Sequence, residues 1–412
     1  MAEDPREGGR PASRKEHSRA ETGKLGAGSR SVHAGEEDQA PYDSLTRPIV
    51  QSSTYVFRDS AELLDFKEGR IARDEYGRYG NPTLRAAEAK IAALDEGEEA
   101  LLFSSGMAAV TTTLLALLSP GAHIILTGEC YRRTRQFCAT LLARYGVETS
   151  LVAPGDIQKV AALLRPETKL ILTESPTNPY LDVVDLEALT KLGRERRVKV
   201  IIDSTFATPF NQRPLEFGVD LVIHSATKYL AGHNDLMAGV VVGSSPLVSA
   251  LRDLQGILGC VLDPHPAYLL LRGLKTLALR MARHNENGLA LARFLETHPK
   301  VRKVYYPGLE GHPSYKIARD QMSGYGGVVS FEIEGDFGAS NAFIDRLRIP
   351  RIAPSLGGVE SLVENVALMS YYELGPEGWR EMGIADALVR YSVGIEDTDD
   401  LITDLKQSLD QI

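Results

Sequence analysis

Apolar residues between about positions 84 and 243 fall into short continuous runs that alternate with longer segments of helical composition. The short runs lie at 99–103, 123–127, 170–173, 200–203 and 220–224, and each ends on polar or small residues. Runs of this kind predict strands that are buried on both faces, as in a parallel sheet. The segments at 84–94, 106–118, 157–164 and 186–196 have the composition of helices. This alternation predicts right-handed βαβ units and a doubly wound, mostly parallel α/β sheet.

The pattern changes after Gly243. A long helical run at 267–296 is expected to link two domains. Beyond it, apolar stretches at 301–305, 327–334, 369–372 and 388–394 predict strands, and 339–347 and the segment from Asp397 predict helices. We therefore expect a large domain at 71–275 and a smaller α+β domain with an antiparallel sheet at 276–412.

The N-terminal region has a different composition. The first thirty residues mix both charges with Gly, Pro and Ser and contain almost no apolar side chains, so burial cannot offset the entropy cost of ordering them. We expect a disordered tail at 1–31, followed by an extended arm at 32–70. The segment lacks the apolar core of a signal peptide, and its acidic residues disfavour a transit peptide, so we expect a cytoplasmic protein.

Composition narrows the class further. A chain of 412 residues with 43% hydrophobic and 25% charged residues is typical of a globular protein of two domains. The net charge of −9 argues against nucleic acid or an anionic membrane as the main partner. No apolar run approaches the ~20 residues that span a bilayer. Cys130, Cys138 and Cys260 show no metal-ligand spacing, so we expect a reducing compartment and no metal.

Two strand ends carry candidate chemistry. The run at 200–203 ends on Asp203, and the run at 220–224 is followed by Ser225, Thr227 and Lys228. Ligands of open α/β sheets bind beyond the carboxyl ends of such strands. An amine, a carboxylate and hydroxyl groups there match the needs of pyridoxal 5′-phosphate (PLP). A solvated lysine and a capping aspartate are the simpler alternative, and the pair alone does not decide between them.

Further segments permit a cofactor site. Ser105, Gly106 and Met107 stand between a strand and a helix, where free backbone N–H groups bind anions, although ordinary strand-to-helix turns look the same. Tyr131 follows another strand and either stacks on a planar ring or belongs to the core. Arg132, Arg133 and Arg135 form either a solvated helix face or an anion site. Tyr76 and Arg78, in a loop rich in Gly and Pro, are either surface residues or phosphate ligands.

An ordered set of segments then resembles a known family. The segments are EYGRYGNPT, SSGM, ECYRRT, ESPTNP, IDSTFATP, HSATKYLAGHNDLMAG, SLGGVES and LVRYSVGIED. Together they resemble the PLP-dependent trans-sulfuration family, from about Val32 to the C-terminus. That family includes cystathionine γ-synthases and γ-lyases, methionine γ-lyases and homoserine sulfhydrylases.

The resemblance implies a type I PLP-dependent transferase fold, like that of aspartate aminotransferase, and assigns roles within it. Lys228 is implied to be the Schiff-base lysine and proton shuttle, Asp203 the partner of the pyridinium nitrogen, and Tyr131 the residue that stacks on the ring. The phosphate is implied to be held by Ser105, Gly106, Met107, Ser225 and Thr227.

The same resemblance implies contributions from a second subunit. Tyr76 and Arg78 are implied to reach the phosphate of the neighbouring subunit, and Tyr76 also its substrate. Arg390 is implied to bind the substrate carboxylate bidentately, helped by Ser355 and by Asn178, which also contacts the cofactor. Since family members are usually tetramers built from dimers with shared sites, we expect a homotetramer in which the arm at 32–70 contacts its neighbour.

Within the family, the segments GHND, YRRTRQF and APSLGG most resemble plant-type cystathionine γ-synthases. Many γ-lyases carry an acidic residue directly before the serine of SLGG, where this chain has Pro354. We therefore expect γ-replacement, which joins L-cysteine to an O-phospho-, O-succinyl- or O-acetylhomoserine to give cystathionine. Arg133 is our candidate for holding an acidic leaving group.

Several alternatives stay open beside this expectation. A γ-lyase, a homoserine sulfhydrylase and an enzyme with an unusual nucleophile share the early chemistry, and a PLP-binding regulatory protein is the non-enzyme alternative. A nicotinamide-binding protein is disfavoured because no GxGxxG occurs, and a serine hydrolase because no GxSxG occurs.

Overall fold

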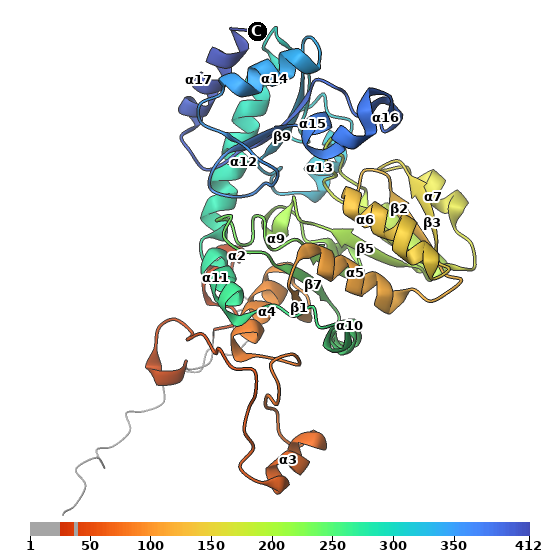
Figure 1. Ribbon diagram of the computed structural model, residues 1–412, viewed down its shortest axis with the longest axis vertical. Coiled ribbons are helices and arrows are strands. Elements are labelled where there is room, and N and C mark those ends of the chain that lie inside the picture. Colours follow the sequence, from red (N-terminus) through yellow and green to blue (C-terminus); the bar gives the residue numbers. More distant parts are fainter. Residues whose placement is uncertain (1–24, 37–39) are drawn as a thin grey trace, which may run out of the picture.

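The computed structural model describes residues 25–36 and 40–412, which form two packed domains and a projecting N-terminal arm (Figure 1). A mixed sheet of seven strands forms the centre of the larger domain, in the order β1-β7-β6-β5-β4-β2-β3. Its strands are β1 (Glu99–Phe103), β2 (His123–Thr127), β3 (Glu148–Val152), β4 (Thr168–Glu174), β5 (Lys199–Asp203), β6 (Leu221–His224) and β7 (Gly239–Gly243). Strands β2 to β6 are parallel, and β7 is antiparallel to both of its neighbours, β1 and β6. The predicted mostly parallel sheet is confirmed.

Helices cover both faces of this sheet because its strands carry apolar residues on both sides. They are α4 (Pro82–Asp95), α5 (Gly106–Leu117), α6 (Arg132–Gln136), α7 (Ile157–Leu163), α8 (Leu186–Arg196), α9 (Thr208–Asn211), α10 (Ser245–Leu258) and α11 (Pro264–Leu274), with the π-helix η2 (Phe137–Leu142) and the 3₁₀ helix η3 (Pro214–Phe217). Along β1, Leu101 and Phe103 pack in the cluster that contains α5 and α10, whereas Leu102 packs in the cluster that contains α4 and α11. The sheet therefore lies between two helical layers.

The smaller domain has a five-stranded sheet in the order β10-β11-β12-β9-β8, antiparallel except for β10 beside β11. Its strands are β8 (Val301–Tyr305), β9 (Val328–Ile333), β10 (Arg351–Ile352), β11 (Leu362–Asn365) and β12 (Leu388–Ser392). Its helices are α12 (Leu277–Glu296), α13 (Tyr315–Gln321), α14 (Phe337–Arg346), α15 (Val366–Tyr371), α16 (Gly375–Glu381) and α17 (Thr398–Leu409), with η4 (Tyr372–Leu374). The α+β organisation that the sequence predicted is present.

Two expectations about elements are wrong. Residues 369–372 are not a strand, because Asn365 accepts a hydrogen bond from the backbone of Leu368 and starts helix α15 there. The strand lies just before, as β11. The expected continuous helix at 267–296 is instead two helices, which Lys275 and Thr276 separate. One core cluster contains side chains of α4 and α11 and also of α12, β9 and α17, so it crosses the expected domain boundary.

The N-terminal region also differs from the expectation. The expected tail lies mostly outside the described residues, but from Ala27 to His33 the chain forms helix α2. Arg30 is buried there and donates to the carbonyl of Ala93 and to Glu96, so the tail does not extend to residue 31.

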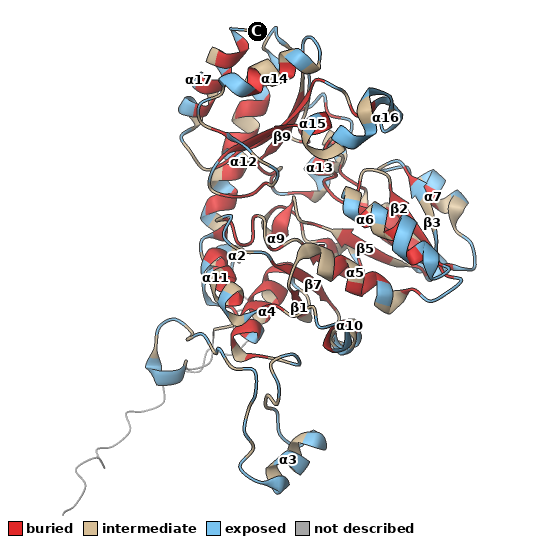
Figure 2. Ribbon diagram, in the orientation of Figure 1, coloured by how far each residue is buried: buried red, intermediate tan, exposed pale blue. Residues whose placement is uncertain are grey.

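The described part of the arm that follows α2 contains η1 (Pro41–Asp43) and α3 (Ser60–Lys67) and projects from the body. Its surface is largely exposed (Figure 2), and the apolar side chains of Tyr42, Leu45 and Val56 are 94%, 96% and 85% exposed. Among the described residues, no helix has the length and apolar character that crossing a bilayer requires.

Candidate active site

A cavity of about 450 Å³ opens where the strands of the large sheet end and the small domain faces them. The large domain contributes Glu174 at the end of β4, Asp203 at the end of β5 and Lys228 after β6. The small domain contributes Arg390 from β12 and Ser355 from the loop before β11. Further predicted residues also line it: Ser105, Gly106, Met107, Tyr131, Asn178, Ser225 and Thr227.

Lys228 points its amine at the small domain. Its Nζ donates a 2.6 Å hydrogen bond to Oγ of Ser355. Burial, together with the positive charge of Arg390, lowers the pKa of Lys228 to about 8. Ser355 has a φ of +125°, a conformation that is rare and strained outside glycine and that occurs preferentially at functional sites. The site therefore holds, in a fixed position, an amine that loses its proton more readily than an ordinary lysine.

Asp203 and Glu174 end neighbouring strands in register, so both side chains leave the same face of the sheet. Thr205 donates to Oδ1 of Asp203 from its backbone N–H at 3.0 Å and from its hydroxyl at 2.5 Å. Burial raises the pKa of Asp203 against the effect of these hydrogen bonds. Burial and the charge of Asp203 raise the pKa of Glu174, which accepts a hydrogen bond from the backbone N–H of Tyr131. Two buried carboxyl groups therefore lie side by side at this edge of the sheet.

The start of α5 is arranged for an anion. Oγ of Ser105 accepts from the backbone N–H of Ala108, and the N–H groups of Gly106 and Met107 precede the first intrahelical bonds. A Cβ atom at Gly106 would lie 2.9 Å from the Oγ of Ser225, so only glycine permits this approach. The hydroxyl of Thr227 donates to the carbonyl of Ala238 rather than pointing freely at the cavity.

Arg390 is held by three groups at once. Its Nη1 donates to Oδ1 of Asn178 at 3.1 Å, and its Nη2 donates to the carbonyl of Ser355 at 3.2 Å and pairs with Glu364 at 3.1 Å. Its Nε is buried and has no partner among the described residues. A fixed guanidinium with an unused donor suits a carboxylate ligand.

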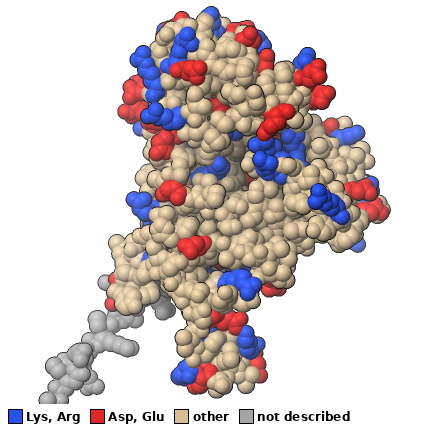
Figure 3. All heavy atoms as spheres, in the orientation of Figure 1, with Lys and Arg blue, Asp and Glu red and all other residues tan. Residues whose placement is uncertain are grey.

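Three predicted residues do not line this cavity in the single chain. Arg133 is exposed, and its Nη1 donates to Gln136, whereas Arg132 of the same helix does line the cavity. Lys and Arg side chains gather over this part of the surface, beside the hollow between the domains (Figure 3). Tyr76 and Arg78 lie near the arm, where Arg78 donates to the carbonyl of Gly256 on α10.

Sequence reasoning missed two acids and a hydroxyl of the site. Glu174 follows an apolar run in the same way as Asp203, so the same rule applied to ESPTNP would have found it. Thr205 lies two residues after Asp203 and fixes its carboxylate. Glu364 lies inside a strand that sequence reasoning did not find, so no pattern pointed to it.

The residues that line the cavity fit PLP. This cofactor requires an amine, a carboxylate, a ring to stack on and an anion site. The site provides them as Lys228 with its lowered pKa, Asp203 at a strand end, the exposed ring of Tyr131, and the helix start at Gly106, where no Cβ atom fits. The fold and the site together define a PLP-dependent enzyme of the type I class.

Comparison with known proteins is consistent with this class. Residues 28–410 match the model of the Cys/Met metabolism PLP-dependent enzymes. Over 388 residues, 93% of this chain and 72% of the relative, the chain is 50% identical to cystathionine gamma-synthase 1, chloroplastic, of Nicotiana tabacum. It is 43% identical over 398 residues to L-methionine gamma-lyase of Fusobacterium nucleatum subsp. nucleatum, covering 94% of this chain and 99% of that one.

A solved structure has the same fold. The crystal structure of metB from Corynebacterium glutamicum superimposes with a TM-score of 0.89 at 38% identity, over 95% of this chain and 99% of that chain. The chain belongs to the Cys/Met metabolism PLP-dependent enzyme family.

Proposed function

We propose that this enzyme catalyses γ-replacement, joining L-cysteine to an activated homoserine to form cystathionine. One observation carries the proposal: 50% identity, along 93% of the chain, to a protein named cystathionine gamma-synthase. Pro354 supports it, because this uncharged residue lines the catalytic cavity at the position where many γ-lyases carry an acid.

Lys228 is the proposed proton carrier. Bound PLP supplies an electron-poor ring that stabilises negative charge on the substrate carbons. Nζ of Lys228, whose pKa is lowered to about 8, is suited to accept the proton of the substrate Cα and to donate it again. Asp203 is proposed to keep the ring nitrogen protonated, and Tyr131 to stack on the ring.

The remaining predicted residues are proposed to bind the two ends of the reactants. Arg390, with Asn178 and Ser355, is proposed to bind the α-carboxylate of the amino acid. The phosphate of the cofactor is proposed to lie at the start of α5, held by Ser105, Gly106, Met107, Ser225 and Thr227. Each of these residues borders the same cavity, which is large enough for a cofactor and a small amino acid.

The leaving group is proposed to be an anion, phosphate above all, that is held by Arg132 and Arg133 at the start of α6. The density of positive charge on this short helix supports the proposal. Arg133→Ala should raise KM for O-phosphohomoserine far more than KM for O-acetylhomoserine, which carries no such charge. Arg132→Ala, which changes the neighbouring arginine that lines the cavity, should show the same preference. Equal increases in KM for the two substrates would contradict the proposal.

A γ-lyase is the second candidate, because L-methionine gamma-lyase of Fusobacterium nucleatum subsp. nucleatum is 43% identical over 398 residues. The test supplies O-phospho-, O-succinyl- and O-acetylhomoserine, each with cysteine, and separately cystathionine alone. Cystathionine formed from one of the activated homoserines supports γ-replacement and identifies the leaving group. Rapid 2-oxobutanoate from cystathionine, with no condensation, supports the lyase.

Assembly is proposed to complete the site. Tyr76 and Arg78 are proposed to reach the phosphate of a neighbouring chain, in a homotetramer of dimers with shared sites. The projecting arm, with apolar side chains that the body of its own chain does not cover, supports a neighbour at this position.

The compartment is proposed to be the cytoplasm, a reducing compartment in which Cys130, Cys138 and Cys260 would stay free. The name of the Nicotiana tabacum relative includes "chloroplastic". The location of a full-length fluorescent fusion in its native cell distinguishes the two.

A further inference from the structure

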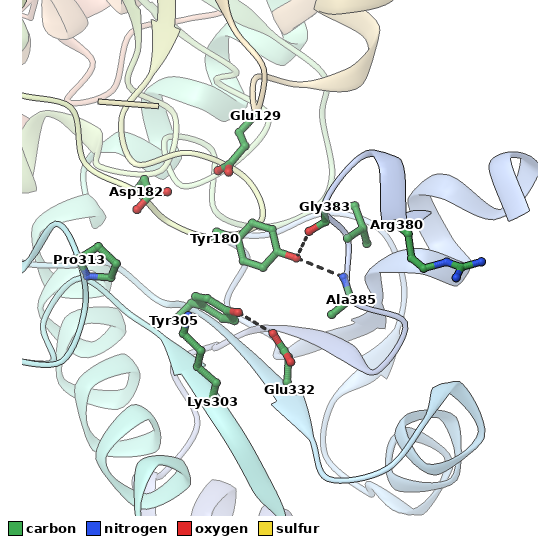
Figure 4. A pocket seen from close by; sticks show the side chains of 11 residues that line it. Glu129, Tyr180, Asp182, Lys303, Tyr305, Pro313, Glu332, Arg380, Gly383 and Ala385 are labelled. Carbon is green, nitrogen blue, oxygen red and sulfur yellow. Dashed lines mark hydrogen bonds between the residues drawn. The ribbon is translucent and has the colours of Figure 1, made fainter. Parts of the chain in front are cut away.

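A second cavity, of about 500 Å³, lies between the two domains and shares no lining residue with the catalytic cavity (Figure 4). Segments of the large domain border one side of it, and strands β8 and β9 and the turn after α16 border the other. The residues that line it include Glu129, Tyr180, Asp182, Lys303, Tyr305 and Ile384.

Two carboxylates, those of Glu129 and Asp182, lie on the large-domain side. Thr177 donates to Oε2 of Glu129 at 2.8 Å, and Ser314 donates to Oδ1 of Asp182 at 3.2 Å. Within residues 25–36 and 40–412, neither acid forms a salt bridge. Burial, reinforced by the charge of Asp182, raises the pKa of Glu129 to about 7. A bound ammonium group would favour the ionised form of this carboxyl.

A lysine without an acidic partner lies on the opposite side. Nζ of Lys303 lies 4.5 Å from the centroid of the Tyr305 ring and, in the described part of the chain, forms no salt bridge. Figure 4 shows this amine facing the space below Glu129 and Asp182. The small-domain side also contains Arg380 and one acid, Glu332, which accepts from Tyr305 and lies 3.8 Å from Arg302. Two acids on one side of the cavity thus face two cations and one acid on the other.

Aromatic and aliphatic surface lies between these charges. The rings of Tyr180 and Tyr305 meet edge to face, 4.7 Å between centroids. Their hydroxyls are already used, since Tyr180 donates to the carbonyl of Gly383 at 2.6 Å and Tyr305 donates to Glu332 at 2.5 Å. The rings, with Ile384, are left to contact an apolar group.

We propose that this cavity binds a free α-amino acid with an apolar side chain. The ammonium group binds Glu129 and Asp182, the carboxylate binds Lys303, and the side chain packs against Tyr180 and Tyr305. A volume of about 500 Å³ suits a ligand of this size, because small-molecule sites commonly span roughly 300–1,000 Å³.

Two short segments connect this cavity to the catalytic cavity. Glu129 is two residues from Tyr131, and Tyr180 is two residues from Asn178, and both of these partners line the catalytic cavity. Tyr180 also bonds to the small domain, through Gly383 and through the backbone N–H of Ala385. A ligand bound here therefore contacts segments that also line the catalytic cavity.

The test uses the holoenzyme after borohydride reduction, which fixes the cofactor to Lys228 so that the catalytic site cannot react with amino acids. Titration calorimetry with L-leucine, which has no leaving group at Cγ, should then show one site per chain. Isoamylamine lacks the carboxylate and 4-methylpentanoate lacks the amine. Because each loses one charge-assisted contact, each should bind at least about tenfold more weakly than L-leucine. No binding of L-leucine to the reduced enzyme would overturn the proposal.

Variants locate the binding. Lys303→Met removes an exposed ammonium and should weaken L-leucine binding about tenfold without changing the melting temperature. Lys300→Met is the matched control on the neighbouring exposed lysine and should bind as the parent does. Equal binding by the Lys303 and Lys300 variants would overturn the proposal, whatever reaction the catalytic site performs.

Discussion

Arg390 acts through the fixed geometry of its guanidinium, which bonds to Asn178, Ser355 and Glu364 at the same time. Lysine at this position would keep the charge but lose the fork of donors. Arg390→Lys should therefore lower kcat/KM for the amino-acid substrate by about a hundredfold, the loss of a bidentate charge-assisted contact. Steady-state kinetics measure this effect. An unchanged kcat/KM in the variant would show that Arg390 does not bind the substrate.

Lys228 should give the cofactor-free protein a distinct pH dependence. Its pKa of about 8, lowered by burial and by Arg390, makes the neutral amine available well below the usual range of lysine. The rate of PLP uptake should be half-maximal near pH 8 and should fall about tenfold for each further unit of pH below it. Stopped-flow absorbance of the bound cofactor measures the rate. Half-maximal uptake above pH 10 would show that the amine is not perturbed.

Individual site residues could be predicted from the sequence where a polar residue directly follows an apolar run. Asp203 and Lys228 were predicted to share the sheet edge, and the structure brings them to one cavity. Glu364 escaped prediction because it is a charged residue inside a buried strand, and its partner Arg390 comes from another strand of the same sheet. Such a pairing exists only after the chain has folded.

Among the elements, helix α17 is fixed to the turn after α14 by one buried carboxylate. Asp404 accepts from the backbone N–H of Arg348 and of Ile349 at 2.9–3.0 Å. Asp404→Ala should lower the free energy of unfolding by about 2–3 kcal/mol, because hydrogen bonds to a charged group are lost and the donors are left without partners. Urea denaturation measures the change. Asp400→Ala, an exposed acid in the first turn of α17, should cost less than about 1 kcal/mol, and equal losses would contradict the role of Asp404.

The sequence predicted several elements whose apolar pattern is regular, although it missed β7, a strand buried at every position. The expected bounds of β1, β2 and α8 match the structure because their apolar patterns are regular. Strand β3 was missed because it lies at the edge of the sheet and carries Glu148, Thr149 and Ser150. Strand β11 was missed because its polar end, Glu364 and Asn365, belongs to the active site and to the cap of α15.

For the whole molecule, the projecting arm is the feature that a single chain leaves unexplained. If Tyr76 and Arg78 serve the site of a neighbour, a mixture of Arg78→Ala and Lys228→Ala chains must form some intact sites. Each variant alone should be nearly inactive, and random mixing should restore about a quarter of the parental activity per site. No recovery in refolded mixtures that contain both chains would place all of these residues in the site of one chain.

The central claim is that the enzyme replaces the γ-substituent rather than eliminating it. The most direct measurement gives purified holoenzyme O-phosphohomoserine with and without L-cysteine and quantifies cystathionine and 2-oxobutanoate in the same sample. We predict that cystathionine dominates when cysteine is present and that 2-oxobutanoate forms slowly without it. Unchanged 2-oxobutanoate and no cystathionine in the presence of cysteine would contradict γ-replacement and make the enzyme a lyase.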